Sequence, residues 1–301
     1  MNNNFRPMLA CSVTDYEQFN KCRFPLFASV KIDGVRGMTI LVDGKVKAVT
    51  RQMKPIPNLF IRETIESWEI PYLDFEITTF DEDSREVDLF NVVSQKVRTF
   101  EGNPLFIANV FDNFATTHAF QQRMHNITLA KCHGTVPKQL LFLSHQGLNK
   151  SEEVIDCINY YEQQNVEGVM FRGAFSLYKY GRSTFKDQCL LRVKFLEESI
   201  GTIIGINQKQ VNLNKLTRDS FGLAERSSHQ ANLLPVEEMG SLTVELPSGV
   251  VFNVGTGFTA EDRRMYWNNF DLYKGRKCRV KHQAFGMKTK PRQPVFIGLE
   301  P

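Results

Sequence analysis

The chain contains 301 residues, 42% of them hydrophobic and 23% charged, and its formal net charge at pH 7 is +4. This composition excludes a wholly disordered chain, because it supplies enough apolar side chains for a sizeable core. No uninterrupted apolar run approaches the roughly 20 residues of a membrane span, and the N-terminal MNNNFRPMLACSV lacks the apolar stretch of a secretory signal. At roughly 100–200 residues per domain, the length predicts two domains.

The six cysteines, at positions 11, 22, 132, 157, 189 and 278, have no Cys-x-x-Cys spacing and no histidine partners at zinc-site intervals. They predict reduced thiols in a cytosolic protein rather than a disulfide or metal framework. The six histidines show no other ligand spacing, so we interpret them as structural or surface residues.

The first clear unit in chain order is a hairpin region at residues 26–50. LFASVK (26–31) and RGMTILV (36–42) are typical of strands on either side of a turn. Asp43-Gly44 predicts a tight hairpin, because both central residues of such a turn need positive φ. KVKAVT (45–50) alternates polar and apolar residues, as a half-buried strand does.

Strands and helices then mix up to residue 198. Asn58 is expected to cap a helix whose apolar residues, including Ile61 and Ile65, share one face. Because the strands and helices do not alternate strictly, the pattern indicates an α+β domain over residues 1–198. The further strands are predicted at 72–78, 105–112, 138–144, 166–172 and 190–195, and the further helices at 84–97, 116–130 and 150–164.

After Glu198 the pattern changes to short β segments with glycine-rich turns and one brief helix near 260–269. About five strands in about 100 residues predict a small Greek-key barrel of the OB type over residues 199–301. The stretch 207–235, between the first two of these strands, is polar and too long for an ordinary turn. We expect a functional loop or insertion there.

The charge is unevenly distributed along the chain. Residues 1–198 carry 23 Lys and Arg against 24 Asp and Glu, whereas residues 199–301 carry 14 against 9. From Lys274 to Arg292 there are eight basic residues and no acidic one, interleaved with apolar residues such as Val280. A folded basic face of this kind favours nucleic acid as a partner over a solvated arm.

Lys31 is the first candidate for covalent chemistry. It stands in Lys31-Ile-Asp33-Gly34-Val-Arg36, at the end of a predicted strand, where the small glycine would let a phosphate approach closely. A lysine must lose its proton before it can attack, and desolvation or nearby cations can bring this about. Taken alone, the motif fits a surface hairpin lysine better than a nucleophile.

Other charged and aromatic candidates follow at strand ends. Asp74 and Glu76 alternate on one predicted strand, and Arg192 and Lys194 on another, so each pair shares a face. Together the candidates supply a nucleophile, basic groups for phosphates, acids for a metal and an aromatic for a base, which nucleotidyl transfer requires. The remaining candidates are Arg51, Phe111, Asp112 and Glu167.

In this order the residues resemble the covalent nucleotidyltransferase superfamily, and specifically the small ATP-dependent DNA ligases of phages and large DNA viruses. Lys31-Ile-Asp-Gly-Val-Arg36 matches the nucleophile motif, and VGTGFTAEDR (254–263) and KTKPRQPVF (288–296) resemble the end of the ligase OB domain. The resemblance covers essentially the whole chain. The other matches are Thr50-Arg51, LDFEI with Glu76, ANVFD with Phe111, Glu167-Gly-Val-Met, YKYGRS with Arg182, and Arg192-Val-Lys194, where the family usually has Lys at position 192.

The resemblance implies an α+β nucleotidyltransferase (adenylation) domain of antiparallel sheets and helices, followed by a C-terminal OB-fold β-barrel. It implies that Lys31 attacks ATP to form lysine–AMP, passes AMP to the 5′-phosphate of a nick, and that the 3′-OH then displaces AMP. ATP and Mg²⁺, for which Mn²⁺ could substitute, are the implied cofactors. The implied protein is a monomer that contacts nicked double-stranded DNA and no membrane.

The resemblance also implies roles for the candidate residues. Glu167 and Glu76 would bind the metal, and Asp33 would orient Lys31 or the metal. The stretch 207–235 would be either a clamp around the duplex or a floppy insertion. The implied nucleotide contacts are Lys194 and Arg192 at the α-phosphate, Arg51 and Glu76 at the ribose, Phe111 against adenine, Arg36 and Arg182 at nucleotide or nick phosphate, and Lys288, Lys290 and Arg292 at pyrophosphate.

Three other functions and one further motif match are alternatives to this interpretation. An mRNA capping guanylyltransferase shares the nucleophile motif, but the C-terminal KPRQPVF favours a ligase, and an RNA ligase is not expected to end in this OB domain. A non-catalytic nucleic-acid-binding protein would not be expected to keep Lys31, Glu76, Glu167 and Lys194 together. Gly255-x-Gly257-x-x-Ala260 satisfies a dinucleotide pattern, but a basic segment follows it where a ribose-binding acid is needed, which argues against a Rossmann unit.

Overall fold

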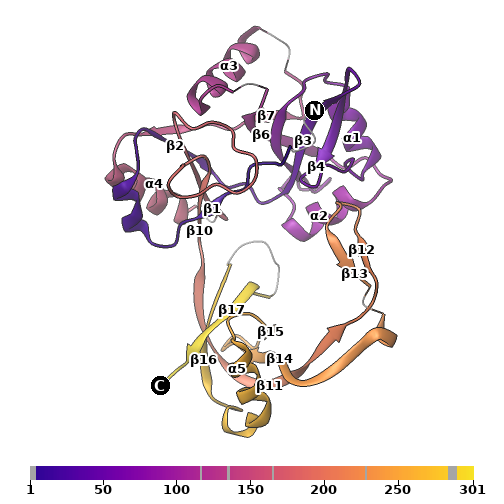
Figure 1. The fold of residues 1–301 in the computed structure, drawn as a ribbon, viewed down its shortest axis with the longest axis vertical. Coiled ribbons are helices and arrows are strands. Elements are labelled where there is room, and N and C mark those ends of the chain that lie inside the picture. The colour runs from indigo at the N-terminus through magenta and orange to yellow at the C-terminus, as the bar shows by residue number, and fades with distance from the viewer. Residues whose placement is uncertain (1–4, 116, 134–135, 165, 228, 284–289) are drawn as a thin grey trace. The chain divides into compact units, whose positions relative to one another are not determined.

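The computed structural model of the chain describes residues 5–115, 117–133, 136–164, 166–227, 229–283 and 290–301, with the backbone alone for 128–133 and 231 (Figure 1). The chain divides into two compact units. Unit 1 contains Met1–Lys194 and Ser220–Leu223, and unit 2 contains Phe195–Asp219 and Ala224–Pro301. The domain boundary expected at residue 198 lies slightly beyond this division and stays a prediction.

Unit 1 is built on two five-stranded sheets, which with the helices confirm the predicted α+β class. Most neighbouring strands are antiparallel, but β1 pairs with β10, and β6 with β7, in parallel. The first sheet has the order β4-β3-β5-β6-β7, with bounds Lys45–Thr50, Val35–Val42, Leu73–Thr79, Phe106–Asn113 and Leu140–Phe142. The second has the order β1-β10-β9-β2-β8, with bounds Cys11–Ser12, Leu191–Lys194, Gly168–Gly173, Leu26–Val30 and Gln146–Leu148.

The hairpin at Asp43-Gly44 and the helix cap at Asn58 form as predicted. Asp43 and Gly44 have φ angles of 48° and 75° and join β3 to β4. The side chain of Asn58 accepts a hydrogen bond from Ile61 N at 2.9 Å, and helix α1 (Leu59–Glu66) begins there. The helix buries Ile61 and Ile65 in a core cluster under the first sheet.

Helix α2 starts later than predicted. It covers Phe90–Arg98 instead of 84–97, and Val87, which the prediction had placed within the helix, is 58% exposed. Asp88 N donates to Thr79 O at 2.9 Å, so the residues before Phe90 extend the pairing beside β5 instead of entering the helix. The remaining helices of unit 1 are α3 (Phe120–His133), α4 (Ser151–Glu162) and the 3-10 helix η1 (Tyr16–Lys21).

Unit 2 contains the predicted OB-type strands in one antiparallel sheet. Phe296 N donates to Thr256 O at 2.8 Å, which joins one edge strand to the residues just after the other edge strand, an arrangement compatible with the predicted OB fold. Helix α5 (Ala260–Asn268) begins at a capping box of Thr259 and Asp262, and the short 3-10 helix η3 (Phe270–Leu272) follows it. The sheet has the order β15-β14-β11-β16-β17, with bounds Val251–Val254, Leu233–Glu245, Glu197–Asn212, Lys277–Gln283 and Arg292–Leu299.

The glycine-rich segment at 255–260 serves packing in this sheet. A Cβ atom at Gly257, where φ is 97°, would lie 2.2 Å from Phe296 O, so only glycine lets the two segments meet. The strands on either side of the segment and helix α5, β15 and β16, are not neighbours in the sheet and run in opposite directions. The segment therefore does not belong to a parallel βαβ unit, and the dinucleotide reading is excluded.

The polar stretch 207–235 is an ordered ribbon rather than a long loop. β11 and β14 continue to pair as far as Asn212 and Leu233, although most residues there are exposed. A two-stranded ribbon exposed on both faces lacks the apolar alternation by which strands are recognised, so the sequence predicted a functional loop or an insertion without indicating its strands. Within the stretch lie β12 (Leu216–Arg218), β13 (Ala224–Arg226) and the 3-10 helix η2 (Gln230–Asn232).

The cysteines whose side chains are described, at positions 11, 22, 157, 189 and 278, are free thiols. Across the described part of the chain, every helix is too short or too polar to cross a membrane.

Candidate active site

Three strands of the second sheet end close together and bring three charged residues to one place. Lys31 directly follows β2, and its backbone N donates to Gly168 O at 2.9 Å. Lys194 ends β10 and lies opposite Gly168 in the register with β9, and Glu167 directly precedes β9. The sheet therefore places Lys31, Glu167 and Lys194 side by side, although they are far apart in sequence.

Glu167 is the common partner of the two lysines. Lys31 Nζ donates to Glu167 Oε2, and Lys194 Nζ lies 2.9 Å from Glu167 Oε1. The Glu167 side chain is only 3% exposed. Burial alone would raise its pKa, but the charges and hydrogen bonds of Lys31 and Lys194 outweigh burial and lower the pKa below its ordinary value. Glu167 is thus a buried anion that holds both lysine side chains in position.

Two glycines of the motifs are required by close backbone approaches. A Cβ atom at Gly168 would lie 2.1 Å from Val193 O, and one at Gly34 would lie 2.2 Å from Ile77 O. The sequence suggested that Gly34 makes room for a phosphate, whereas in the structure it makes room for the backbone of β5. A side chain at either position would push apart the strands on which Lys31 and its neighbours depend.

Arg36 is held by a buried carboxylate. Its Nε and Nη2 donate to Asp74 Oδ1 and Oδ2 at 2.8 and 2.5 Å, and its Nη1 donates to Met8 O at 2.6 Å. Tyr178 OH donates to the same Asp74 at 2.7 Å. The two parallel bonds fix the plane of the guanidinium group. Asp74 therefore positions Arg36, a role that its alternation with Glu76 did not reveal.

Phe111 owes its orientation to an irregularity in β6. The register between β5 and β6 shifts by one residue there, so that Phe111 is the extra residue of a β-bulge. Bulges commonly re-aim a side chain beside a functional site. The guanidinium carbons of Arg36 and Arg172 lie 5.5 and 5.3 Å from the centre of the Phe111 ring.

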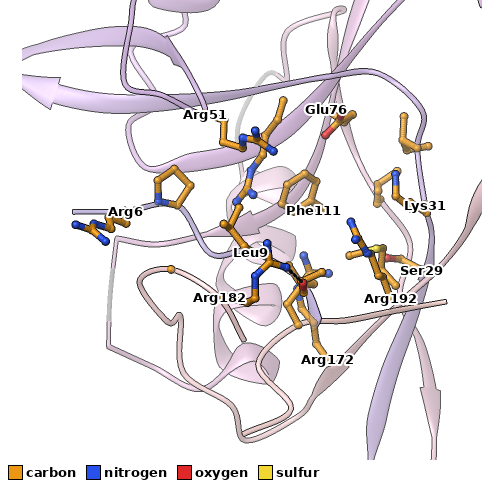
Figure 2. A pocket seen from close by; sticks show the side chains of 18 of the residues that line it. Arg6, Leu9, Ser29, Lys31, Arg51, Glu76, Phe111, Arg172, Arg182 and Arg192 are labelled. Atoms are coloured by element: carbon orange, nitrogen blue, oxygen red, sulfur yellow. Dashed lines mark hydrogen bonds between the residues drawn. The ribbon is translucent and has the colours of Figure 1, made fainter. Parts of the chain in front are cut away.

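Lys31, Arg36 and Phe111 line a cavity of about 770 Å³ (Figure 2), a size typical of small-molecule sites. Its described wall contains seven basic side chains and one acidic one around Phe111. Such a wall suits a ligand with a polyanionic part and a flat part. The charged residues of the wall are Arg6, Lys31, Arg36, Arg51, Arg172, Arg182, Arg192 and Glu76.

Glu76 is the acidic residue of this wall. Burial raises the pKa of Glu76 to about 7 from its ordinary 4.5, against the lowering effect of Lys31 and Arg36, and the charge of Glu167 adds to the rise. Glu76 lies opposite Arg36 in the register of β5 with β3. At neutral pH its side chain is divided between the acid and the carboxylate.

Three further predicted residues, Arg51, Arg182 and Arg192, also line the cavity. Arg182 Nη1 donates to Ala10 O, and Arg192 Nε donates to Ser12 Oγ, both at 2.9 Å. The unusual Arg at position 192 is thus anchored by a neighbouring strand, while it still presents a cation to the cavity.

Three predicted residues of unit 1, Glu167, Lys194 and Asp33, are not part of the cavity wall. Asp33, two residues after Lys31 in the sequence, is half-buried and does not line the cavity. Lys290 is exposed in unit 2, and Arg292 begins β17 there. Lys288 lies outside the described residues. The roles implied for Asp33, Lys288, Lys290 and Arg292, like those of the residues at the cavity, stay predictions.

The sequence did not predict that the N-terminal segment contributes to the cavity. Arg6 and Leu9 line it, and Leu9 N donates to Gly181 O at 2.7 Å. Leu9 also pairs with Arg182 as a parallel bridge. The sequence of the N-terminal segment contains no pattern that predicts its pairing with residues near Gly181, so sequence reasoning could not find this contact.

Two buried polar side chains of the wall were also missed. Ser29 Oγ and the Nε and Nη1 atoms of Arg172 are buried without a hydrogen-bond partner, and Asp112 Oδ2 is 3.6 Å from Arg172 Nε. Buried polar atoms normally have partners, so such atoms in a cavity wall indicate a polar ligand or water. The available signal for Arg172 was its alternation with Met170 on the strand that follows Glu167.

The comparisons with known proteins agree with this geometry. Residues 7–194 match the family model "ATP dependent DNA ligase domain", and residues 236–299 match "DNA ligase OB-like domain". The structure is similar to that of Chlorella virus DNA ligase–adenylate, with 27% identity, 99% of each chain covered and a TM-score of 0.54. A search of the curated proteins finds no match.

A second solved structure, described as one of the Lig E DNA ligases, has a TM-score of 0.71 at 21% identity, and the match covers 98% of this chain and 99% of that one. At this identity the likeness concerns the fold alone. The fold, together with the cavity that Lys31 lines, is that of the nucleotidyltransferase class. More narrowly, the chain belongs to the ATP-dependent DNA ligase family, since the catalytic-domain model covers more than half of it.

Proposed function

We propose that this chain seals nicks in duplex DNA through three nucleotidyl transfers, with Lys31 as the nucleophile. The convergence of Lys31, Glu167 and Lys194 beside a cavity rich in cations carries the proposal. Lys31 Nζ attacks the α-phosphorus of ATP, a nitrogen–phosphorus bond forms, and the bond to the pyrophosphate oxygen breaks. The AMP group then moves to the 5′-phosphate of the nick, and the 3′-OH displaces it.

Lys31 must give up a proton before it attacks. Glu167 Oε2 is the acceptor in contact with Nζ, but its lowered pKa makes it a weak base. Its main work is therefore to orient the lysine. Phosphate oxygens of bound ATP compete with Glu167 for Lys194, and Lys194 then stabilises the negative charge that builds up at the α-phosphate.

A divalent cation fits the same residues. Among the described residues, no group of three or more His, Cys, Asp or Glu side chains could enclose a metal ion. Mg²⁺ bound largely through substrate phosphates needs only one or two protein carboxylates, and Glu76 and Glu167, which both interact electrostatically with Lys31, meet this need. Such an ion would neutralise phosphate charge and favour the uncharged amine.

The rest of the cavity suits the nucleoside. Phe111 offers an aromatic face for adenine, and the partnerless hydroxyl of Ser29 offers a polar contact close to Lys31 in the chain. Arg51 and Glu76 serve the ribose, and Arg36, Arg182 and Arg192 serve phosphates. Asp33, Lys288, Lys290 and Arg292 keep the roles that the family resemblance implies.

Unit 2 supplies a basic surface for the DNA backbone. Along β16 the basic residues Lys277, Arg279 and Lys281 alternate with the buried Cys278 and Val280. Phosphate contacts of this kind position a duplex without reading its sequence, which sealing requires. The match of this region to a DNA ligase OB-like domain supports a ligase over a capping enzyme.

The proposal is tested with α-labelled ATP, Mg²⁺ and denaturing electrophoresis. We expect the 34.6 kDa protein to take up label and Lys31→Ala to take up none. Lys47→Ala is the matched control, because Lys47 is a surface lysine of the same unit that pairs with Glu66. Addition of a nicked duplex should then remove the label from the wild-type protein and yield sealed DNA.

Other outcomes would contradict the proposal in distinct ways. Label from GTP alone would indicate a capping enzyme, and sealing of nicked RNA but not nicked DNA would indicate an RNA ligase. The absence of label from either nucleotide would indicate a non-catalytic binding protein.

A further inference from the structure

Four residues of the polar insertion, Ser220–Leu223, belong to unit 1 rather than to unit 2. Within unit 1, Phe221 is only 8% exposed and joins the core cluster that contains Ala48 and Ile56. The guanidinium carbon of Arg98 lies 4.6 Å from the centre of the Phe221 ring. The segment is therefore packed into the unit by Phe221, and Leu223 packs against the same cluster.

The segment packs against the turn that follows β4. Thr50 N donates to Lys54 O at 2.7 Å and Met53 N donates to Thr50 O at 2.8 Å, which closes the turn. Thr50 Oγ1 donates to Phe221 O at 3.1 Å, and both groups are buried. This hydrogen bond ties the turn directly to the segment.

Gly222 makes the contact close. Its φ of 79° favours glycine, and a Cβ atom there would lie 2.7 Å from Lys54 Cγ and 3.0 Å from Gln52 Cβ. The backbone of Gly222 thus rests against side chains of the turn with no room for a side chain of its own.

The same turn lines the nucleotide cavity. Arg51, Gln52 and Met53 are part of the cavity wall. The backbone of Met53 has a positive φ of 61°. A residue other than glycine adopts such a conformation only when the surrounding structure holds it there. The turn is therefore held by Phe221 and Gly222, while Arg51 and its neighbours reach the cavity.

We propose that Phe221 and Gly222 are positioning residues for nucleotide binding, which hold the turn at 50–54 so that Arg51 reaches the nucleotide. This inference rests on the proposed function, since it requires ATP in that cavity. Because coupling between two binding events is reciprocal, ATP binding must in turn stabilise the packing of Ser220–Leu223. The insertion then acts on the first chemical step, before any DNA is present.

The test is the rate of lysine adenylation in a single turnover, measured against ATP concentration without DNA. In Phe221→Ala we expect the ATP concentration for half-maximal rate to rise about fivefold or more, with the saturating rate changed less than about twofold. Phe221→Leu should recover most of the loss. Leu216→Ala is the matched control, because Leu216 is an apolar residue of the same insertion but is 56% exposed.

Two further measurements separate positioning from mere folding. Thr50→Val removes the hydrogen bond from the side of the turn and should raise the half-maximal ATP concentration in the same direction. Hydrogen exchange of the wild type with an ATP analogue that cannot transfer AMP should show protection of both 50–54 and 220–223. In Phe221→Ala the protection of 50–54 should be lost.

An unchanged half-maximal ATP concentration in both Phe221→Ala and Thr50→Val would overturn the inference. So would a loss confined to the saturating rate and to the fraction of protein that takes up AMP, because that is the mark of a structural defect. A wild-type protein that takes up no AMP would instead overturn the proposed function.

Discussion

The two units hold their basic side chains in contrasting ways. In unit 1, Lys31 and Lys194 pair with a carboxylate, Glu167, that is only 3% exposed. In unit 2, Arg279 pairs with Glu300 at 2.9 Å and Lys281 with Glu198 at 3.5 Å, and these side chains are between 26% and 49% exposed. The first arrangement fixes two cations on a buried carboxylate, whereas the second leaves the cations to exchange partners in water.

This difference has a physical consequence. A buried pair that loses one partner leaves an uncompensated charge, which is costly. An exposed pair contributes little to stability and is screened by salt. Variants in the cavity of unit 1 should therefore have large effects that depend weakly on salt, and variants on β16 should have small effects that depend strongly on it.

The largest effect is expected for Glu167→Gln. The neutral amide cannot hold both lysines or serve a cation, so the saturating rate of lysine adenylation should fall about 10²–10³-fold. Glu66→Gln, which alters a carboxylate paired with Lys47 outside the cavity wall, should stay within about twofold of the wild type. A Glu167→Gln rate within tenfold of the wild type, or a deficit that salt abolishes, would break the contrast between the units.

Asp74→Asn should have the next largest effect. It breaks the two-bond contact to Arg36 and leaves that guanidinium group short of charge compensation. We expect the free energy of unfolding to fall by about 3 kcal/mol, together with a higher half-maximal ATP concentration. Asp88→Asn is the control, since Asp88 is also buried and paired with Lys96 but lies away from the cavity. It should lower stability without changing the ATP dependence, and an equal change in both variants would contradict the role of Asp74.

Much of the candidate site could be predicted from the sequence, because Lys31, Glu167 and Lys194 each stand at the end of a strand. Lys31, Glu167 and Lys194 follow or precede short apolar runs, and the sheet register then brings them together. The cap at Asn58 and the turn at Asp43-Gly44 could also be predicted, because each depends on residues adjacent in the sequence.

What the sequence did not reveal depends on contacts between distant segments. Two examples are the pairing of Leu9 with Arg182 and the packing of Phe221 beside Thr50. Neither contact produces a hydrophobic periodicity in the sequences of the segments involved. The bulge that turns Phe111 also arises only from the register of two strands. Helix α2 was placed too early because an isolated bridge between Phe80 and Val87, invisible in the local pattern, keeps those residues beside β5.

A smaller effect is expected from pH, through Glu76. Its pKa is about 7 in the folded protein and ordinarily 4.5, so the folded state binds more protons than the unfolded state between these values. Stability should therefore fall as pH rises from about 4.5 to 7 and level off above 7. From pH 5.5 to pH 8 the free energy of unfolding of the wild type should fall by about 2 kcal/mol through this group. Glu76→Gln should not show this fall.

The measurement for Glu76 is the free energy of unfolding in denaturant at both pH values. If the free energies of unfolding of Glu76→Gln and the wild type differ by the same amount at pH 5.5 and pH 8, burial does not raise the pKa of Glu76. The adenylation rate at low ATP should also rise between pH 6 and 8 in the wild type, with a shallower rise in Glu76→Gln.

The smallest effect is expected for Lys277→Ala on β16. Lys277 is exposed and has no ion pair within the part of unit 2 that the structure describes. If it meets one DNA phosphate, its loss should reduce the slope of log affinity against log salt for a nicked duplex by about 0.9. Affinity should drop only severalfold at low salt, and adenylation without DNA should be unchanged. Lys45→Ala, an exposed lysine of unit 1, should leave the slope intact, and an unaltered slope in Lys277→Ala as well would remove this face from the DNA contact.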